Sequence, residues 1–188
     1  MSGDFVADRG SSVRILDLYP DVGNCAALLM ESVMEQAGRP IRLTEGFRSY
    51  VYQNALYAKG RTAPGVIVTW AKGGQSYHNF GVAFDVCFAG PDPYLERDPE
   101  KNRLWNLVVE LGLELGLSAG ANFPIGKKDL PHFEKTYGFS EFQMDTITRS
   151  GGIRLLWEKF DETLGISNAL WETMKLPDPM IPVEGDQS

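Results

Sequence analysis

The chain has 188 residues, a formal net charge of −7, two histidines and two cysteines. This length suits one domain with its own hydrophobic core, and the acidic balance disfavours nucleic acid, which requires clustered lysine and arginine. Two histidines exclude a three-histidine zinc site, and two cysteines exclude a four-cysteine zinc cluster.

The first half of the chain mixes helical and strand-like patterns. Residues 1–15 carry little periodicity and are expected to form an arm. Apolar residues at helical spacing predict a helix over 21–38, and alternating residues predict a strand over 41–47. A second helix is expected over 49–59, and a short strand over 66–70.

The second half contains the clearest strand of the sequence, over 82–89, and a long helix over 100–117. A short strand follows over 131–135, and two helices are expected after Ser140, the second over 153–164. Strands and helices are mixed without regular βαβ units, which predicts an α+β fold with a small antiparallel sheet and flanking helices.

The predicted domain organisation is one catalytic domain over residues 1–188. Its core spans about 16–138, a helical extension packed on the core spans 139–176, and 177–188 form a flexible tail. No signal peptide and no membrane-spanning segment is visible, so we expect synthesis in the cytoplasm without membrane insertion. A disulfide between Cys25 and Cys87 is not expected in that compartment.

The first histidine precedes the strand over 82–89. Alternation places Asp85 on a face of small side chains, with room for a ligand beside it. His78 and Asp85 would be about 23 Å apart in an extended chain, so a shared metal requires a bend. Gly81 permits that bend. The alternative is a solvated histidine in a turn and a structural aspartate.

The second histidine lies in an acidic segment over 128–134. Pro131 favours an extended backbone, which places His132 and Glu134 on one strand face, while Asp129 precedes the strand. The alternative is a histidine at a surface edge, next to acids that form ordinary salt bridges.

Together, two histidines and Asp85 make a three-ligand zinc set that leaves one position open, as in catalytic sites. Asp129 or Glu134 then offers a general base. Arg48, between a strand and a helix, is suited to stabilise an oxyanion or bind a substrate carboxylate. Its alternative role is a packing arginine paired with Glu45.

Three motifs in order resemble the zinc D,D-peptidases of the VanX and VanY types. Within them, the chain is most similar to the L-alanyl-D-glutamate endopeptidases of phage endolysins and sporulating bacteria. The resemblance covers about residues 40–138. The motifs are Ser-x-His-x-x-Gly-x-Ala-x-Asp at 76–85, Asp-x-Pro-His-Phe-Glu at 129–134, and Phe-Arg-Ser at 47–49, followed by Gln53 and Leu-Tyr-Ala-Lys-Gly-Arg-Thr.

The resemblance implies a fold shared with the hedgehog signalling domain and one zinc ion per chain. The implied zinc ligands are His78, Asp85 and His132. It further implies that Asp129 is the general base and that Arg48 steadies the oxyanion or orients the substrate. The residues implied to position the substrate peptide are Ser76 and Gln53.

Two features depart from the family pattern or extend it. The stretch over 120–128 lacks the tryptophan usual before the Asp-x-Pro-His motif, which leaves the pocket wall and the scissile bond open. Cys87 lies two residues beyond Asp85, where it is either an additional ligand or small-residue packing. Glu134 stays open as an alternative to Asp129 as the base.

The sequence therefore predicts a zinc metallopeptidase that hydrolyses peptidoglycan stem peptides between L-alanine and D-glutamate. We expect a monomer that reaches the wall after release or delivery. One alternative is a D-alanyl-D-alanine carboxypeptidase or dipeptidase. Another is a catalytically silent zinc-containing binding module of the same fold.

Overall fold

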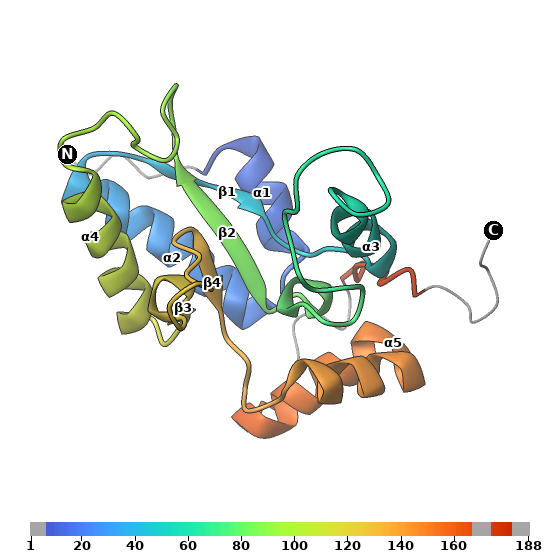
Figure 1. Cartoon of the computed structure of the whole chain (residues 1–188). Coiled ribbons are helices and arrows are strands. Elements are labelled where there is room, and N and C mark those ends of the chain that lie inside the picture. The colour runs from blue at the N-terminus through green and yellow to red at the C-terminus, as the bar shows by residue number, and fades with distance from the viewer. Residues whose placement is uncertain (1–6, 167–173, 182–188) are drawn as a thin grey trace. The chain divides into compact units, whose positions relative to one another are not determined.

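Four strands of the chain form one antiparallel sheet of order β1-β2-β4-β3 (Figure 1). The strands are β1 (Ile41–Glu45), β2 (Ala83–Phe88), β3 (Ser118–Ala119) and β4 (His132–Glu134). The helices are α1 (Arg9–Leu16), α2 (Pro20–Ala37), α3 (Tyr50–Ala58), α4 (Lys101–Glu114) and α5 (Glu141–Leu164). The α+β prediction is confirmed.

The computed structural model describes residues 7–166 and 174–181. These residues form two compact units. The sheet unit contains 7–46 and Ala83–Lys135, and the helical unit contains Phe47–Val82, 136–166 and 174–181. The single catalytic domain stays a prediction, and residues 182–188 of the predicted tail lie outside the described residues. Within the described chain, no helix is long and apolar enough to cross a membrane.

The sheet unit is held together by aromatic packing on one face of β2. Phe84 stacks on Phe133 of β4 with ring centroids 5.7 Å apart, and Phe88 meets Trp105 of α4 edge to face at 5.3 Å. Helix α4 therefore covers this face and lies beside α2 (Figure 1). Asp85 alternates with these rings and projects to the opposite face, as the period of a strand requires.

The helical unit contains α3, α5 and the short 3₁₀ helix η1 (Tyr77–Phe80). A capping box of Ser140 and Gln143 begins α5, as predicted for Ser140, and Gly151 and Gly152 interrupt its helical backbone. Two helical segments thus meet at a kink. In the second segment, the buried Trp157 indole donates a hydrogen bond to the Phe80 carbonyl oxygen at 3.0 Å. Helix α5 therefore braces η1.

Two local predictions are wrong. Residues 1–15, expected as an arm, contain α1, whose N-cap Asp8 accepts a hydrogen bond from Ser11 N–H. The Ser11 hydroxyl accepts in turn from Leu43 N–H at 2.9 Å. Only Ser11 of this helix is buried, so α1 has no apolar stripe that a sequence pattern would reveal.

The strand predicted over 66–70 is also absent. Its β-branched residues favour a strand, but the segment joins no ladder, and the backbone directly after it is held by side chains of α3. Gln53 donates from its amide to Ala71 O at 2.9 Å, and Asn54 accepts from Gly73 N–H at 2.8 Å. Cys25 and Cys87 are both free and buried, which confirms the expectation of no disulfide.

Gly112 of α4 should be indispensable, because a Cβ there would lie 2.3 Å from Cε1 of Phe133. In an open helix, Gly112→Ala would add about 1 kcal/mol of stability. Here the clash dominates, and we expect the free energy of unfolding in urea to fall by about 2 kcal/mol. The control Glu110→Ala, exposed on the same helix, should change it by less than about 0.5 kcal/mol. A more stable Gly112→Ala protein would contradict this packing.

Candidate metal centre and active site

The pairing of β2 with β4 places Asp85 directly opposite His132. Residues opposite each other in an antiparallel pair share a face of the sheet. The His132 Nδ1 atom lies 3.0 Å from Asp85 Oδ1, and both side chains are mostly buried. An imidazole nitrogen and a carboxylate oxygen thus form one compact pair of donor atoms.

Glu134 approaches the other edge of the same imidazole. Its Oε2 lies 3.0 Å from His132 Nε2, so the ring stands between two carboxylates. Burial alone would lower the pKa of His132. The hydrogen bonds and negative charges of Asp85 and Glu134 outweigh burial and raise the pKa to about 9.

This donor set fits a zinc ion. Ligand atoms about 2.0 Å from zinc in tetrahedral geometry lie about 3.3 Å apart, close to the 3.0 Å between His132 Nδ1 and Asp85 Oδ1. A zinc-binding histidine commonly donates its other N–H to a carboxylate, which fixes the tautomer and the orientation of the ring. Glu134 occupies that second position.

Asp129 lies on the loop between η2 (Gly120–Asn122) and β4, and it is exposed. Its N–H donates to Gly120 O at 3.0 Å, and its carbonyl oxygen accepts from His132 N–H at 3.2 Å. A Cβ on Gly120 would lie 2.4 Å from Asp129 O and 3.0 Å from His132 Cβ. A glycine is therefore needed for the loop to lie this close to His132.

Phe123 provides an aromatic ring beside the candidate site. Its ring centroid is 5.8 Å from that of His132, with the planes tilted by 49°. The stretch over 120–128 lacks the tryptophan that the family pattern led us to expect. In this chain, Phe123 is the residue of that stretch whose ring lies beside the His132 imidazole.

In the helical unit, η1 carries His78, whose side chain is buried. Gly81 ends η1 with a left-handed backbone, φ 72°, which confirms the bend predicted between His78 and the strand. Arg48 N–H donates to His78 O at 2.9 Å, which ties the Phe-Arg-Ser motif to the histidine motif.

Asn79 connects three segments of the helical unit. Its Nδ2 donates to Arg48 O at 2.8 Å, and its Oδ1 accepts from Gly74 N–H at 2.9 Å. Its side chain is fully buried, and the bond from Gly74 N–H is buried as well. One feature of the sequence indicates this role: Asn79, with its side-chain amide, lies between His78 and Gly81.

Two residues expected to contact substrate have different environments. Ser76 is half-buried at the start of η1 and makes no capping bond with its side chain. Gln53 is fully buried in α3, and its amide donates to Thr69 Oγ1 at 3.3 Å as well as to Ala71 O. Gln53 therefore holds the loop after α3.

The predicted site residues divide between the two units. The sheet unit contains Asp85, Asp129, His132 and Glu134, and the helical unit contains Arg48, Gln53, Ser76 and His78. Cys87 is buried and lies opposite Arg42 in the β1–β2 pairing, one strand repeat away from Asp85. Sequence reasoning missed the parts played by Asn79, Gly120 and Phe123.

Comparison with known proteins gives three similarities. A family model described as VanY, D-alanyl-D-alanine carboxypeptidase, matches residues 23–135, which contain every site residue above. The peptidoglycan L-alanyl-D-glutamate endopeptidase CwlK of Bacillus subtilis (strain 168) is 40% identical over 124 residues, covering 63% of this chain and 73% of that protein. The crystal structure of the L-Ala D-Glu endopeptidase ChiX of Serratia marcescens matches with a TM-score of 0.44 and 20% identity, over 70% of this chain and 90% of that chain.

Asn79→Ala should strongly destabilise the protein, because it removes the acceptor of the buried Gly74 N–H and the donor to Arg48 O. We expect the free energy of unfolding to fall by about 3 kcal/mol. Asn54→Ala is the matched control, since Asn54 accepts a similar bond from Gly73 N–H but is exposed. Water replaces that bond, so its loss should stay below about 1 kcal/mol. Equal losses in urea denaturation would refute the role of Asn79.

Proposed function

The chain belongs to the VanY family of D-alanyl-D-alanine carboxypeptidases, and we propose that it is a zinc-dependent L-alanyl-D-glutamate endopeptidase of peptidoglycan. The observation that carries the choice of bond is the 40% identity to CwlK, extending over 73% of that endopeptidase. The description of the family model supports a second candidate, a D-alanyl-D-alanine carboxypeptidase.

The proposed zinc ligands are His78, Asp85 and His132. Each offers one ligand atom, and the set matches the three-ligand arrangement of catalytic zinc sites. Support for Asp85 and His132 comes from their paired donor atoms in the sheet unit. Support for His78 comes from its place in the chain. Only Gly81 and Val82 separate η1, which carries His78, from β2, which carries Asp85.

When bound, zinc polarises the scissile carbonyl and makes water more acidic. Asp129 takes the proton of the attacking water and passes it to the leaving amine nitrogen. Arg48 steadies the negative charge that develops on the carbonyl oxygen. Ser76 binds the substrate backbone, and the buried Gln53 acts only by holding the loop that leads to Ser76.

The position of Glu134 supports Asp129 as the base. The two nitrogens of an imidazole point to opposite edges of the ring, and Glu134 binds the edge opposite Asp85. Asp85 and His132 Nδ1 would hold the metal, while Glu134 contacts Nε2 at the opposite edge of the ring. We assign Glu134 the positioning of His132, by acceptance of the Nε2 proton.

The loop that carries Asp129 supports an enzyme over a silent binding module. Its backbone is bonded both to Gly120 and to His132, which keeps an exposed carboxylate three residues from a ligand. A binding module requires no such base. The proposal includes a monomer made in the cytoplasm that reaches the cell wall by release or delivery.

The products of digested peptidoglycan test the scissile bond. We expect new amino termini on D-glutamate and no free D-alanine, identified by amine labelling and mass spectrometry. Removal of zinc with a chelator should abolish the release, and added zinc should restore it. Release of D-alanine instead would establish the carboxypeptidase. Absence of any zinc-dependent product would disprove the peptidase.

Substitutions separate the base from the positioning residue. Asp129→Asn should lower kcat by about 10²- to 10⁴-fold and leave zinc affinity unchanged. Glu134→Gln should weaken zinc binding by about 10- to 100-fold, measured by competition with a chromophoric chelator. Glu114→Gln, an exposed carboxylate on α4, is the control for charge. If Glu134→Gln kept its zinc and lost turnover while Asp129→Asn stayed active, the two assignments would be reversed.

A further inference from the structure

One stretch of the acidic chain contains no acid at all. Between Glu45 and Asp85 there is no aspartate or glutamate, although the whole chain carries 25 acidic residues and a net charge of −7. The same stretch contains four cations, which are Arg48, Lys59, Arg61 and Lys72. The helical unit therefore has a continuous basic segment from the end of β1 to the start of β2.

Large apolar side chains are exposed in the same stretch. Trp70 is 79% exposed and Val66 is 75% exposed, and Ile67 and Val68 are also exposed. These residues form the segment that was predicted as a strand and that joins no sheet. Exposed apolar side chains gathered next to cations are typical of a binding surface.

Arg61 organises this surface. Its guanidinium carbon lies 3.9 Å from the centroid of the Tyr57 ring and 4.9 Å from that of Trp70, so the cation contacts both rings. Its Nη2 donates to Thr69 O at 3.1 Å, and Nη1 donates to Tyr57 O. Lys72 Nζ lies 5.3 Å from the Tyr57 centroid.

The loop that carries this surface is held in place by Gln53 of α3 and by the close approach of Gly60. Gln53 binds Thr69 and Ala71, and a Cβ on Gly60 would lie 2.7 Å from Ile67 N, so the loop folds tightly against the end of α3. The loop that carries Trp70 is thus already ordered in the free protein. Less conformational entropy is then lost when a ligand binds.

We propose that Tyr57, Arg61, Val66, Val68, Trp70 and Lys72, here called the Trp70 surface, bind the glycan strand of peptidoglycan next to its anionic stem peptides. The proposal rests on the proposed function, since it names the part of the wall that the enzyme holds while it cleaves. Sugar rings present flat C–H faces to an aromatic ring, and the stem peptides and their carboxylates complement Arg61 and Lys72.

The arrangement of Arg61 favours a glycan over a lipid membrane. A membrane-binding loop buries its apolar side chains in hydrocarbon, where an arginine costs about 2.5 to 3.5 kcal/mol. Here the guanidinium contacts the ring of Trp70 itself, so the ring cannot enter hydrocarbon without the cation. A polar ligand with apolar faces accommodates both groups.

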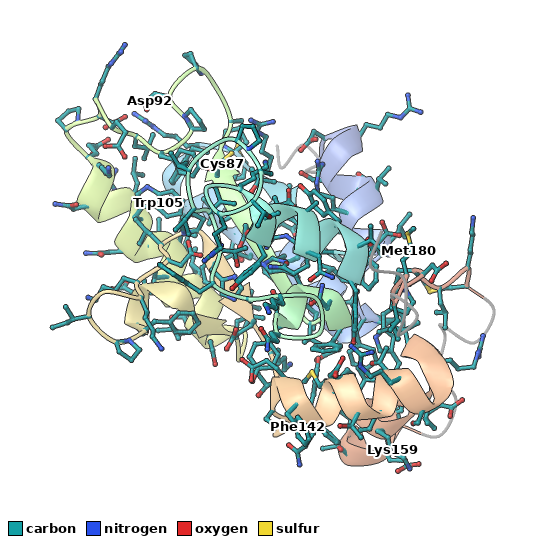
Figure 2. All side chains as sticks on the ribbon, turned by 45° about the vertical axis from the view of Figure 1, so that its right-hand side comes forward. Cys87, Asp92, Trp105, Phe142, Lys159 and Met180 are labelled. Carbon is teal, nitrogen blue, oxygen red and sulfur yellow. The ribbon has the colours of Figure 1, made fainter. Side chains whose placement is uncertain are left out.

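Cosedimentation with purified, insoluble peptidoglycan tests the proposal. The full zinc-loaded chain carries Asp129→Asn so that the wall stays intact. Trp70→Ala should raise the apparent Kd about tenfold, as for an aromatic anchor of a binding surface, and Trp70→Phe should recover part of the loss. The matched control is Phe142→Ala, because Phe142 is also 79% exposed and projects from α5 (Figure 2).

Charge is tested by Lys72→Gln, which should weaken binding at low salt and have little effect at about 1 M salt, where charges are screened within about 3 Å. Lys159→Gln, on α5 in Figure 2, is its control. In the otherwise wild-type enzyme, Trp70→Ala should lower the rate of cleavage of insoluble peptidoglycan more than the rate of cleavage of a short soluble stem peptide. Thermal unfolding verifies that each variant is folded.

Three results would overturn the Trp70 surface. They are unchanged binding by folded Trp70→Ala, an equal loss in Phe142→Ala, and Trp70-dependent sedimentation with phosphatidylglycerol vesicles. Failure of the proposed function is distinguishable, because it would appear as a lack of peptide cleavage by the unsubstituted enzyme while Trp70-dependent wall binding persists.

Discussion

The register between β2 and β4 is the constraint on which the candidate metal centre depends. Asp85 lies opposite His132 only in this register, and a slip of one residue would place Phe133 on the ligand face. The Phe133 ring prevents the slip because it packs on Phe84 and against Gly112, where a methyl group would not fit. A hydrophobic contact on one face of the sheet thus determines the donor geometry on the other.

In the helical unit, polar contacts hold η1, the 3₁₀ helix that carries His78. Buried Asn79 joins η1 to Arg48 and Gly74, and Trp157 of α5 binds the carbonyl at the end of η1. The C-terminal helix therefore has a structural task that requires no contact with substrate. A directional hydrogen-bond network suits a 3₁₀ helix, whose four residues are too few to be fixed by apolar packing alone.

The parts of the fold that follow from local patterns could be predicted. The alternation around Asp85, the bend at Gly81 and the shared face of His132 and Glu134 all depend on the backbone period of a single segment. The contacts that depend on distant partners could not. The strand expected over 66–70 has no neighbour to pair with, and the contact of Glu134 with the edge of the His132 ring opposite Asp85 depends on the pairing of two strands.

Net charge is a poor guide to this surface, because the acids and bases are segregated along the chain. The total of −7 correctly disfavours nucleic acid, yet it suggests repulsion from an anionic wall only if the charge is spread evenly. The acid-free stretch between Glu45 and Asp85 places four cations in one part of the helical unit, while the acids of that unit lie on α5 and after it. The proposed binding by the Trp70 surface therefore depends on where the cations of this stretch lie and not on the net charge of the chain.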